Sequence, residues 1–166
     1  MKSINPEEIT IRTDIRHGDL GYLTYLHGKL YGEEYGYNVV YEKYVAQGIA
    51  ELMENYNSQK DHIWFVENQG KMVGAIAIMG RSGEIAQLRY FLLLPQYRGL
   101  GLGKKLVQTA LDFCKTTGYR TVYLLTATEL EAAAHLYHKF GFRKTREVTT
   151  HHWGKEVVEA YYDLNI

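Results

Sequence analysis

The feature that most constrains the fold of this chain is a segment in which a strand passes into a helix through alternating glycines. We expect the strand over Glu84 to Leu94, where Pro95 ends it, and the helix from about Lys104 onward. Alternating glycines let the backbone approach a ligand closely, with several N–H groups pointing the same way. A helix start adds free N–H donors and partial positive charge. The segment therefore predicts a phosphate or pyrophosphate site, formed by Arg98, Gly99, Leu100, Gly101, Leu102, Gly103 and Lys104.

Two common phosphate-binding loops do not fit these residues. The dinucleotide fingerprint G-x-G-x-x-G needs a third glycine, but that position is Lys104 when counted from Gly99 and Leu106 when counted from Gly101. The nucleoside-triphosphate loop needs Ser or Thr after its lysine, where Lys105 stands. Nucleotide-dependent phosphotransfer is therefore disfavoured, and a tight strand-to-helix turn without a ligand is the remaining alternative.

The rest of the chain reads as strands and helices in the order β-α-α-β-β-β-α-β-α-β-β. Asp19 is expected to cap the first helix, and residues 68–71 to form the turn of a hairpin. Together the elements predict a mixed α/β (α+β) fold with helices on both faces of the sheet, in one domain over residues 1–166. The other elements are expected at 9–13, 19–30, 39–56, 63–66, 72–79, 104–117, 121–126, 129–140, 144–150 and 157–164.

Charge and cysteine content narrow the classes of function. The 166 residues carry 19 Lys and Arg against 19 Asp and Glu, so the formal net charge is zero. A chain without positive excess lacks the electrostatic basis of non-specific nucleic-acid binding, so we expect no nucleic-acid partner. The single cysteine allows neither an intrachain disulfide nor a cysteine-paired zinc site. Because no apolar run follows Met1-Lys2 and no stretch could span a bilayer, we expect no signal peptide, no membrane partner and a cytoplasmic location.

The glycine loop and a second motif together resemble one enzyme family. Arg98-x-x-Gly101-x-Gly103 resembles the acyl-CoA pyrophosphate loop of the GNAT (GCN5-related) N-acetyltransferases. Downstream, residues 133–142 read Ala-Ala-His-Leu-Tyr-His-Lys-Phe-Gly-Phe, which resembles the A-x-x-L-Y-x-x-x-G-F helix and turn of that family. The resemblance covers nearly the whole chain, because the order of elements given above is also the GNAT order.

Two further segments resemble the acetyltransferase half of proteins that fuse a MarR-type regulator to a GNAT domain. They are residues 27–36, His-Gly-Lys-Leu-Tyr-Gly-Glu-Glu-Tyr-Gly, and residues 151–154, His-His-Trp-Gly. This narrower resemblance keeps a second function open, that of a non-catalytic acyl-CoA-binding sensor or regulatory module.

The GNAT resemblance implies a single-domain acyl-CoA N-acyltransferase fold with a mixed, mostly antiparallel sheet. It also implies direct transfer of an acetyl group from acetyl-CoA, the co-substrate, to a primary amine of a small molecule or peptide, often by a homodimer. Backbone N–H groups of residues 98–104 would hold the CoA pyrophosphate, and the pantetheine arm would lie along the preceding strand near Phe91 and Leu93. Tyr137 would protonate the departing thiolate, with a core tyrosine as the alternative. Leu130 departs from the family, which often has Asn there to contact the cofactor arm.

The attacking amine must lose a proton, and several carboxylates are candidates to accept it. Glu84, at the start of the strand leading to the loop, is the first candidate, and Glu33 or Glu34 is the second; a solvated surface carboxylate is the alternative for each. His135 and His138 lack the further ligands of a metal site, so no metal is expected. Tyrosines cluster in the first two helices, where the family builds its acceptor groove, although helix packing also explains them. The candidate acceptor-binding residues are Tyr31, Glu34, Tyr35, His152 and Trp153.

Overall fold

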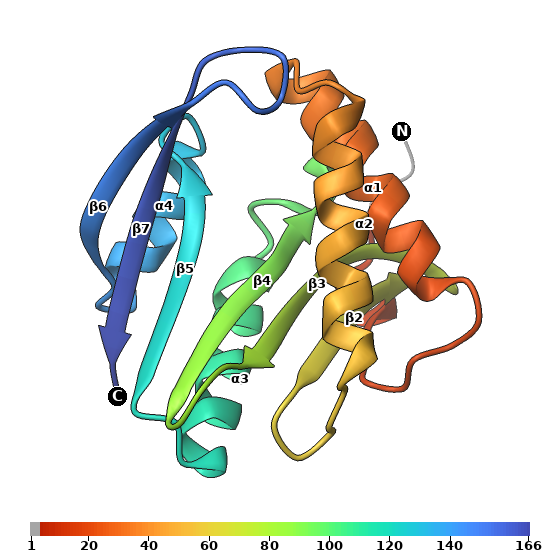
Figure 1. Cartoon of the computed structure of the whole chain (residues 1–166). Coiled ribbons are helices and arrows are strands. Elements are labelled where there is room, and N and C mark those ends of the chain that lie inside the picture. Colours follow the sequence, from red (N-terminus) through yellow and green to blue (C-terminus); the bar gives the residue numbers. More distant parts are fainter. Residues whose placement is uncertain (1–3) are drawn as a thin grey trace.

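The computed structural model describes residues 4–166, which contain a seven-stranded sheet in the order β1-β2-β3-β4-β5-β7-β6 (Figure 1). Met1 and Lys2, on which the signal-peptide expectation depends, lie outside the described residues. The predicted hairpin is present, with His62 opposite Ile78 and Asn68 opposite Lys71. The strands are β1 (Ile9–Arg12), β2 (His62–Asn68), β3 (Lys71–Gly80), β4 (Ile85–Leu93), β5 (Thr121–Ala127), β6 (Arg143–Thr150) and β7 (Val157–Asn165).

Strands β4 and β5 are the one parallel pair among the described strands, and they separate part-way along their length. They pair from Ile85 opposite Thr121 to Gln87 opposite Tyr123, and both strands continue beyond that point without pairing to each other. Tyr90 has a φ of 53°, and the register of β4 against β3 shifts beside it. A bulge of this kind bends its strand. The bend opens a gap between β4 and β5, and the far half of β4 keeps free backbone groups on that side.

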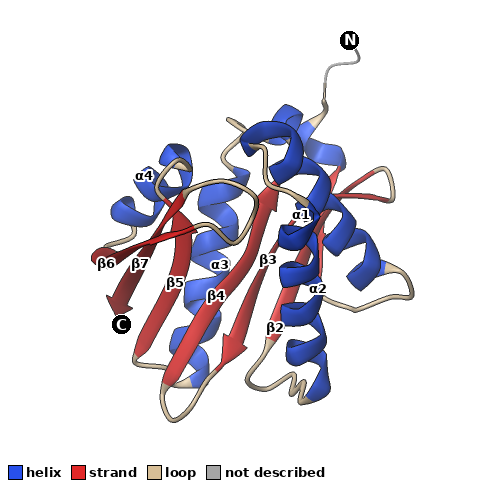
Figure 2. Ribbon diagram, turned by 45° about the horizontal axis from the view of Figure 1, so that its top comes forward, coloured by secondary structure: helices blue, strands red, loops and turns tan. Residues whose placement is uncertain are grey.

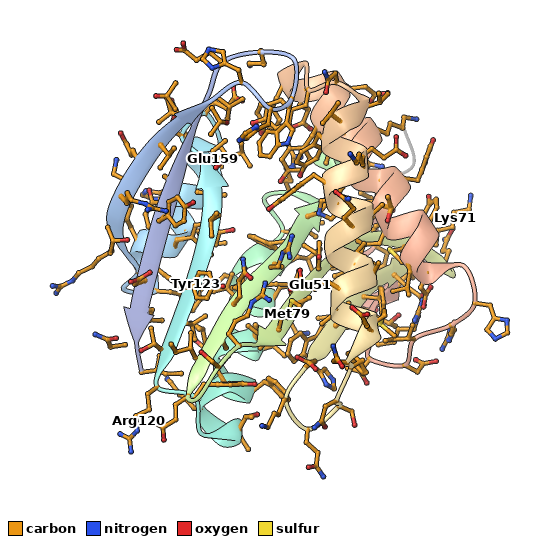
Figure 3. The ribbon with its side chains drawn as sticks, in the orientation of Figure 1. Glu51, Lys71, Met79, Arg120, Tyr123 and Glu159 are labelled. Atoms are coloured by element: carbon orange, nitrogen blue, oxygen red, sulfur yellow. The ribbon has the colours of Figure 1, made fainter. Side chains whose placement is uncertain are left out.

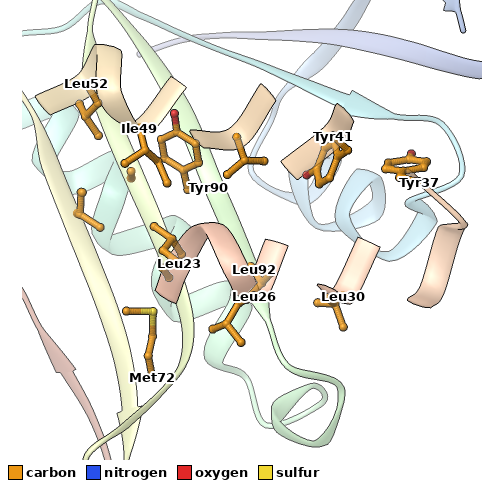
Figure 4. Packing of buried hydrophobic residues seen from close by; sticks show 14 of the residues in the cluster. Leu23, Leu26, Leu30, Tyr37, Tyr41, Ile49, Leu52, Met72, Tyr90 and Leu92 are labelled. Carbon is orange, nitrogen blue, oxygen red and sulfur yellow. The ribbon is translucent and has the colours of Figure 1, made fainter. Parts of the chain in front are cut away.

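The helices cover both faces of the sheet, as predicted (Figure 2). The first two helices share one core with β2, β3 and β4, in which Leu23 and Ile49 are buried (Figure 4). The other two helices share a second core with the opposite face of the sheet. The mixed, mostly antiparallel fold is therefore confirmed. The helices are α1 (Asp19–Tyr35), α2 (Val39–Glu54), α3 (Leu102–Thr117) and α4 (Glu131–Lys139), and none of them is long and apolar enough to cross a membrane.

Asp19 does not cap α1, and that prediction is wrong. The residue before the helix is Gly18, whose φ is 90°, and Asp19 is already the first helical residue. Its buried carboxylate instead pairs with Arg12 on β1, at 2.6 Å, and accepts the Arg16 backbone N–H at 2.6 Å. Asp19 therefore ties the start of α1 to the edge of the sheet, and a sequence pattern of helix caps does not reveal a partner on the preceding strand.

Candidate active site

The loop between β4 and α3 leaves a row of backbone N–H groups without an acceptor in the part of the chain that the structure describes. Gly99 and Gly101 have φ values of 76° and 78°, a left-handed conformation that glycine adopts without steric cost. The N–H of Lys105 donates to the Gly101 carbonyl at 3.1 Å, but the N–H groups of residues 99–104 donate to no described acceptor. With the start of α3, they form an anion-binding surface.

These N–H groups border a cavity of about 540 Å³, which we call the loop groove. Its walls come from the loop, the end of β4, the end of α1 and helix α4. A Cβ added to Gly103 would lie 3.3 Å from Leu136 and 3.4 Å from Phe91, so this glycine keeps the start of α3 open. The predicted cofactor-binding residues that line the groove are Phe91, Leu93, Arg98, Gly99, Gly101, Gly103 and Lys104.

Two predicted loop residues turn their side chains away from the groove. Leu100 is 43% exposed to solvent, and Leu102 packs against the core beneath α3. Neither side chain lines the groove. Any part that these two residues play in anion binding is therefore limited to their backbone N–H groups, which is the part that the sequence predicts.

Arg98 is held beside the groove by two partners. Its Nε donates to the Leu93 carbonyl at 3.0 Å, and its guanidinium forms an ion pair with Glu34 at 2.9 Å. The pair is half exposed, so it adds little to stability, but it joins α1 to the end of β4. Glu34 and Tyr35, both predicted to contact the acceptor, consequently lie on the wall of the loop groove.

A second cavity, of about 120 Å³, lies where β4 and β5 separate, and we call it the aromatic pocket. The loop groove and the aromatic pocket share Tyr31, Phe91 and Leu130 as lining residues, so the two cavities adjoin. One wall of the pocket is a cluster of rings from α1, α2, the connection between these helices and the segment before β7, with centroids 4.9 to 6.2 Å apart. Figure 4 labels two of them, Tyr37 and Tyr41. This wall consists of Tyr31, Tyr37, Tyr41, Tyr44 and Trp153.

Tyr137 lies on α4 at the border of the aromatic pocket. Its side chain is buried, and its ring centroid lies 6.2 Å from that of Phe91 on β4. Burial raises the pKa of the Tyr137 phenol above its usual value, and the neighbouring Tyr31 and Tyr162 raise it further. The Tyr137 hydroxyl therefore keeps its proton at every physiological pH and is available as a hydrogen-bond donor.

The glycine loop, the loop groove and helix α4 with Tyr137 fall largely within a region that matches one protein family. A sequence profile of the Acetyltransferase (GNAT) family matches residues 29–142. The chain belongs to the GNAT family. The expectation drawn from the glycine loop and the residue 133–142 motif is thereby confirmed, whereas the narrower resemblance to regulator fusions stays a prediction.

Known proteins of the GNAT family resemble this chain in sequence and in fold. N-acetyltransferase family 8 member 3 from Rattus norvegicus is 33% identical over 117 residues, which are 64% of this chain and 51% of that protein, so the chain spans about half the length of this relative. An acetyltransferase from Streptococcus agalactiae 2603 superposes with a TM-score of 0.78 at 20% identity, over 96% of this chain and 99% of that one. Spermidine N-acetyltransferase from Vibrio cholerae, solved in complex with CoA and spermine, gives 0.68 at 19%, over 96% of each chain. At these identities the structural likeness shows the fold alone.

Glu84 does not reach either cavity of this GNAT chain, and its placement corrects the first candidate for the proton acceptor. It precedes β4 at the end opposite to the glycine loop, and its exposed carboxylate pairs with Arg120 at 3.2 Å. Figure 3 labels Arg120 at the end of the sheet opposite to Glu159. A strand of nine residues spans about 30 Å, far beyond the hydrogen-bond reach that a general base needs. Glu33 is also exposed, with Lys29 3.9 Å away.

The two residues predicted from the His-His-Trp segment separate in the structure. Trp153 is buried and lines the aromatic pocket, where its ring lies 5.0 Å from that of Tyr37. His152 is exposed and lines neither cavity, although its charge acts on Glu159 of the aromatic pocket, so its contact with the acceptor stays a prediction. The two residues lie in the turn between β6 and β7, which buries the Trp153 indole and leaves the His152 imidazole exposed.

The sequence analysis missed two charged residues of the aromatic pocket, Arg89 on β4 and Glu159 on β7. Glu159 lies opposite Ala127 at the end of β5, and burial raises the pKa of its carboxyl group. A sequence signal did exist for Arg89, because it is the one charged side chain in the apolar run from Leu88 to Leu94. Within residues 4–166, no group of three or more His, Cys, Asp or Glu side chains could hold a metal ion.

His27 is a buried neutral imidazole on the wall of the aromatic pocket. Its Nδ1–H donates to the Leu23 carbonyl at 2.9 Å. Burial lowers its pKa to about 4; the hydrogen bond to Leu23 opposes this, and the charge of Arg89 adds to it. The neutral form of His27 therefore suits an apolar site at neutral pH.

We expect His27 to make the protein sensitive to acid. Its folded pKa of about 4 lies below the value of 6.5 in an unfolded chain, so its contribution to stability is present above pH 6.5 and is lost as the pH falls toward 4. Between pH 7 and pH 4 the free energy of unfolding should fall by about 3 kcal/mol through His27, at about 1.36 kcal/mol for each pKa unit. Urea unfolding at pH 7 and pH 4 measures it, with His27→Gln as the variant that cannot titrate. An equal loss in both proteins would contradict this assignment.

Proposed function

We propose that residues 1–166 form one acetyltransferase domain that moves an acetyl group from acetyl-CoA to the primary amine of a small molecule or peptide. The observation that carries the proposal is the row of N–H groups of residues 99–104, which have no described acceptor and border the loop groove. A diphosphate offers several charged oxygens that can accept hydrogen bonds from these N–H groups, whereas an uncharged ring offers few such acceptors. We also propose a cytoplasmic location and a homodimer. Size-exclusion chromatography with light scattering tests the homodimer through its molar mass.

The chain's own residues suit CoA along the whole loop groove. The N–H groups of residues 99–104 would hold the pyrophosphate, and Lys104 would add positive charge beside it. The free backbone edge of β4 near Phe91 and Leu93 would pair with the amides of the pantetheine arm, as an added strand does. The acetyl thioester would then lie near Tyr31 and Phe91, where the groove meets the aromatic pocket.

The proposed reaction is a direct transfer in which the amine nitrogen attacks the thioester carbonyl carbon. The new C–N bond forms, the C–S bond breaks, and the nitrogen loses a proton. Tyr137 would donate a hydrogen bond, and in the limit its proton, to the departing sulfur, and solvent would return a proton to the phenol. Because the raised pKa makes Tyr137 a weak acid, stabilisation of the developing thiolate is the larger part of its effect. Holding both reactants together supplies much of the remaining rate.

Glu159 replaces Glu84 as our candidate to accept the proton of the amine. It is the one carboxylate among the described residues that line the aromatic pocket. Burial raises the pKa of Glu159, which makes its carboxylate a better base than an exposed one. Glu34 forms an ion pair with Arg98 instead, and it does not line the aromatic pocket.

Release of free CoA thiol that depends on an added amine tests the proposed function. We expect thiol release with acetyl-CoA and a panel of primary amines, and none without an amine. The alternative, a non-catalytic acyl-CoA sensor, is favoured by one observation: Leu130 lines both cavities and gives α4 no side-chain cap, where an asparagine would offer polar atoms. Saturable CoA binding without turnover on any amine would support the sensor and contradict the enzyme. Thermal stabilisation by ATP but not by acetyl-CoA would contradict both.

A further inference from the structure

Arg89 occupies a place that the fold keeps free for it. Its guanidinium lies over the rings of Tyr90, 4.8 Å from the centroid, and Tyr44, 5.7 Å from the centroid. On the adjoining helix α2 stands Gly48, where an added Cβ would lie 2.5 Å from the Arg89 guanidinium and 2.5 Å from the Tyr90 hydroxyl. Glycine is less favourable than alanine inside a helix. Helix α2 therefore carries a residue of low helix propensity at a position where a methyl group would displace the Arg89 guanidinium and the Tyr90 hydroxyl.

The guanidinium of Arg89 has no anionic or carbonyl partner among the described residues, although acceptors lie close by. These acceptors bind Arg81 instead, which pairs with Glu51 at 2.7 Å and donates to the Gln87 side-chain oxygen at 3.0 Å. The same Gln87 oxygen also accepts the Tyr123 hydroxyl at 3.2 Å. A partly buried cation that rests on ring faces keeps its N–H edge for a ligand.

Among the side chains that the structure describes, the aromatic pocket is lined by one positively charged and one negatively charged side chain. Arg89 lies on β4 and Glu159 on β7, and no other charged side chain of the described residues lines this pocket apart from the neutral imidazole of His27. A polyamine would need several carboxylates, and the pocket offers one. A molecule with an amine and a carboxylate close together matches one cation and one anion on different walls.

We propose that Arg89 binds the carboxylate of the acceptor, so that the preferred acceptors are free amino acids and similar small amino carboxylates. The planar fork of a guanidinium fits a carboxylate with two parallel hydrogen bonds. The amine of such a molecule would point toward Glu159 and the acetyl thioester. The cavity of about 120 Å³ has the scale of a small acceptor rather than of a protein surface. This inference rests on the proposed acetyl transfer to amines and names its substrate class.

Matched pairs of acceptors test the inference. Each pair consists of an amino acid and the amine that lacks its carboxylate: L-phenylalanine with 2-phenylethylamine, and L-leucine with isoamylamine, with spermidine as a third type. We expect kcat/KM to be at least about 10-fold higher for the amino acid of each pair, since its carboxylate would accept charge-assisted hydrogen bonds from Arg89. Calorimetry with CoA present measures the binding of the same molecules without turnover and should give the same preference.

Four variants separate the role of Arg89 from a general effect on the fold. Arg89→Gln should remove the preference, because kcat/KM for the amino acids should fall much further than kcat/KM for the plain amines, whereas Arg89→Lys should keep part of the preference. The Kd for acetyl-CoA reports whether the loop groove is intact in each variant. Gly48→Ala should weaken the preference as well, because its methyl group would displace the guanidinium. Arg120→Gln, which removes an exposed arginine far from both cavities, should change nothing.

The outcomes distinguish this inference from the proposed function. Transfer to plain amines or spermidine in preference to amino acids would overturn the inference and leave the acetyltransferase standing. An undiminished preference in Arg89→Gln would overturn it too. If Arg89→Gln does not fold, an undiminished preference in Gly48→Ala would overturn it in the same way. Amino-acid binding that requires Arg89 without any transfer would overturn the proposed enzyme and support Arg89 as the carboxylate site. Neither transfer nor binding of any acceptor would overturn both.

Discussion

Replacement of Gly101 by valine is expected to weaken the binding of acetyl-CoA by about 100-fold or more. Gly101 has a φ of 78°, a conformation that costs a β-branched residue about 1–2 kcal/mol, so the variant loop should change its backbone course. A changed course turns the N–H groups of residues 99–104 away from the groove. Each lost hydrogen bond to a phosphate oxygen is worth about 1.5 to 3 kcal/mol. Calorimetric titration with acetyl-CoA measures the change in Kd.

Gly118→Val is the matched control for this loop variant. Gly118 follows the other end of the same helix α3, has a φ of 91°, and has no atom within 4 Å of an added Cβ, as is true of Gly101. Both variants therefore carry a similar backbone strain and a similar loss of stability. Only Gly101→Val should lose acetyl-CoA. Wild-type affinity in Gly101→Val, or an equal loss of affinity in both variants, would show that the loop does not hold the coenzyme.

Replacement of Tyr137 by phenylalanine is expected to lower kcat by about 100-fold, the lower range for a positioned proton donor. The variant keeps the ring that packs against Phe91 and Phe142, so the fold and the cavity shape should be preserved. The hydroxyl is lost, and with it the hydrogen bond to the departing sulfur. The Kd for acetyl-CoA should stay within about twofold of wild type, because the loop and not Tyr137 holds the pyrophosphate. Steady-state kinetics and calorimetry measure the two quantities.

Tyr162→Phe provides the control for loss of a buried hydroxyl. Tyr162 is buried, its ring centroid lies 6.2 Å from that of Tyr137, and it lines neither cavity. We expect nearly wild-type turnover from this variant. If Tyr137→Phe turned over as fast as Tyr162→Phe, the thiolate would be protonated by solvent and Tyr137 would be a core residue.

The parts of the fold that follow from local patterns could be predicted from the sequence. Helix α3 and the hairpin of β2 and β3 depend on periodicity and turn residues, and both are found where they were expected. The cofactor loop also belongs to this class, since Gly99 and Gly101 are contiguous with the helix start that they serve. Such features need no knowledge of what packs against them.

The aromatic pocket could not be predicted in the same way, because it depends on the separation of β4 from β5. The positive φ of Tyr90 and its register shift create that gap, and no sequence rule applied to an isolated tyrosine would place a bulge there. Arg89 and Glu159 face the same cavity only as a result. The error at Glu84 is different, since the length of β4 alone already places that residue about 30 Å from the loop.

A crystal structure of the protein with acetyl-CoA tests the central claim most directly. The account predicts the diphosphate oxygens within about 3.2 Å of backbone nitrogens among residues 99–104, and the thioester where the loop groove meets the aromatic pocket. A diphosphate bound elsewhere, with these N–H groups still facing solvent, would contradict it.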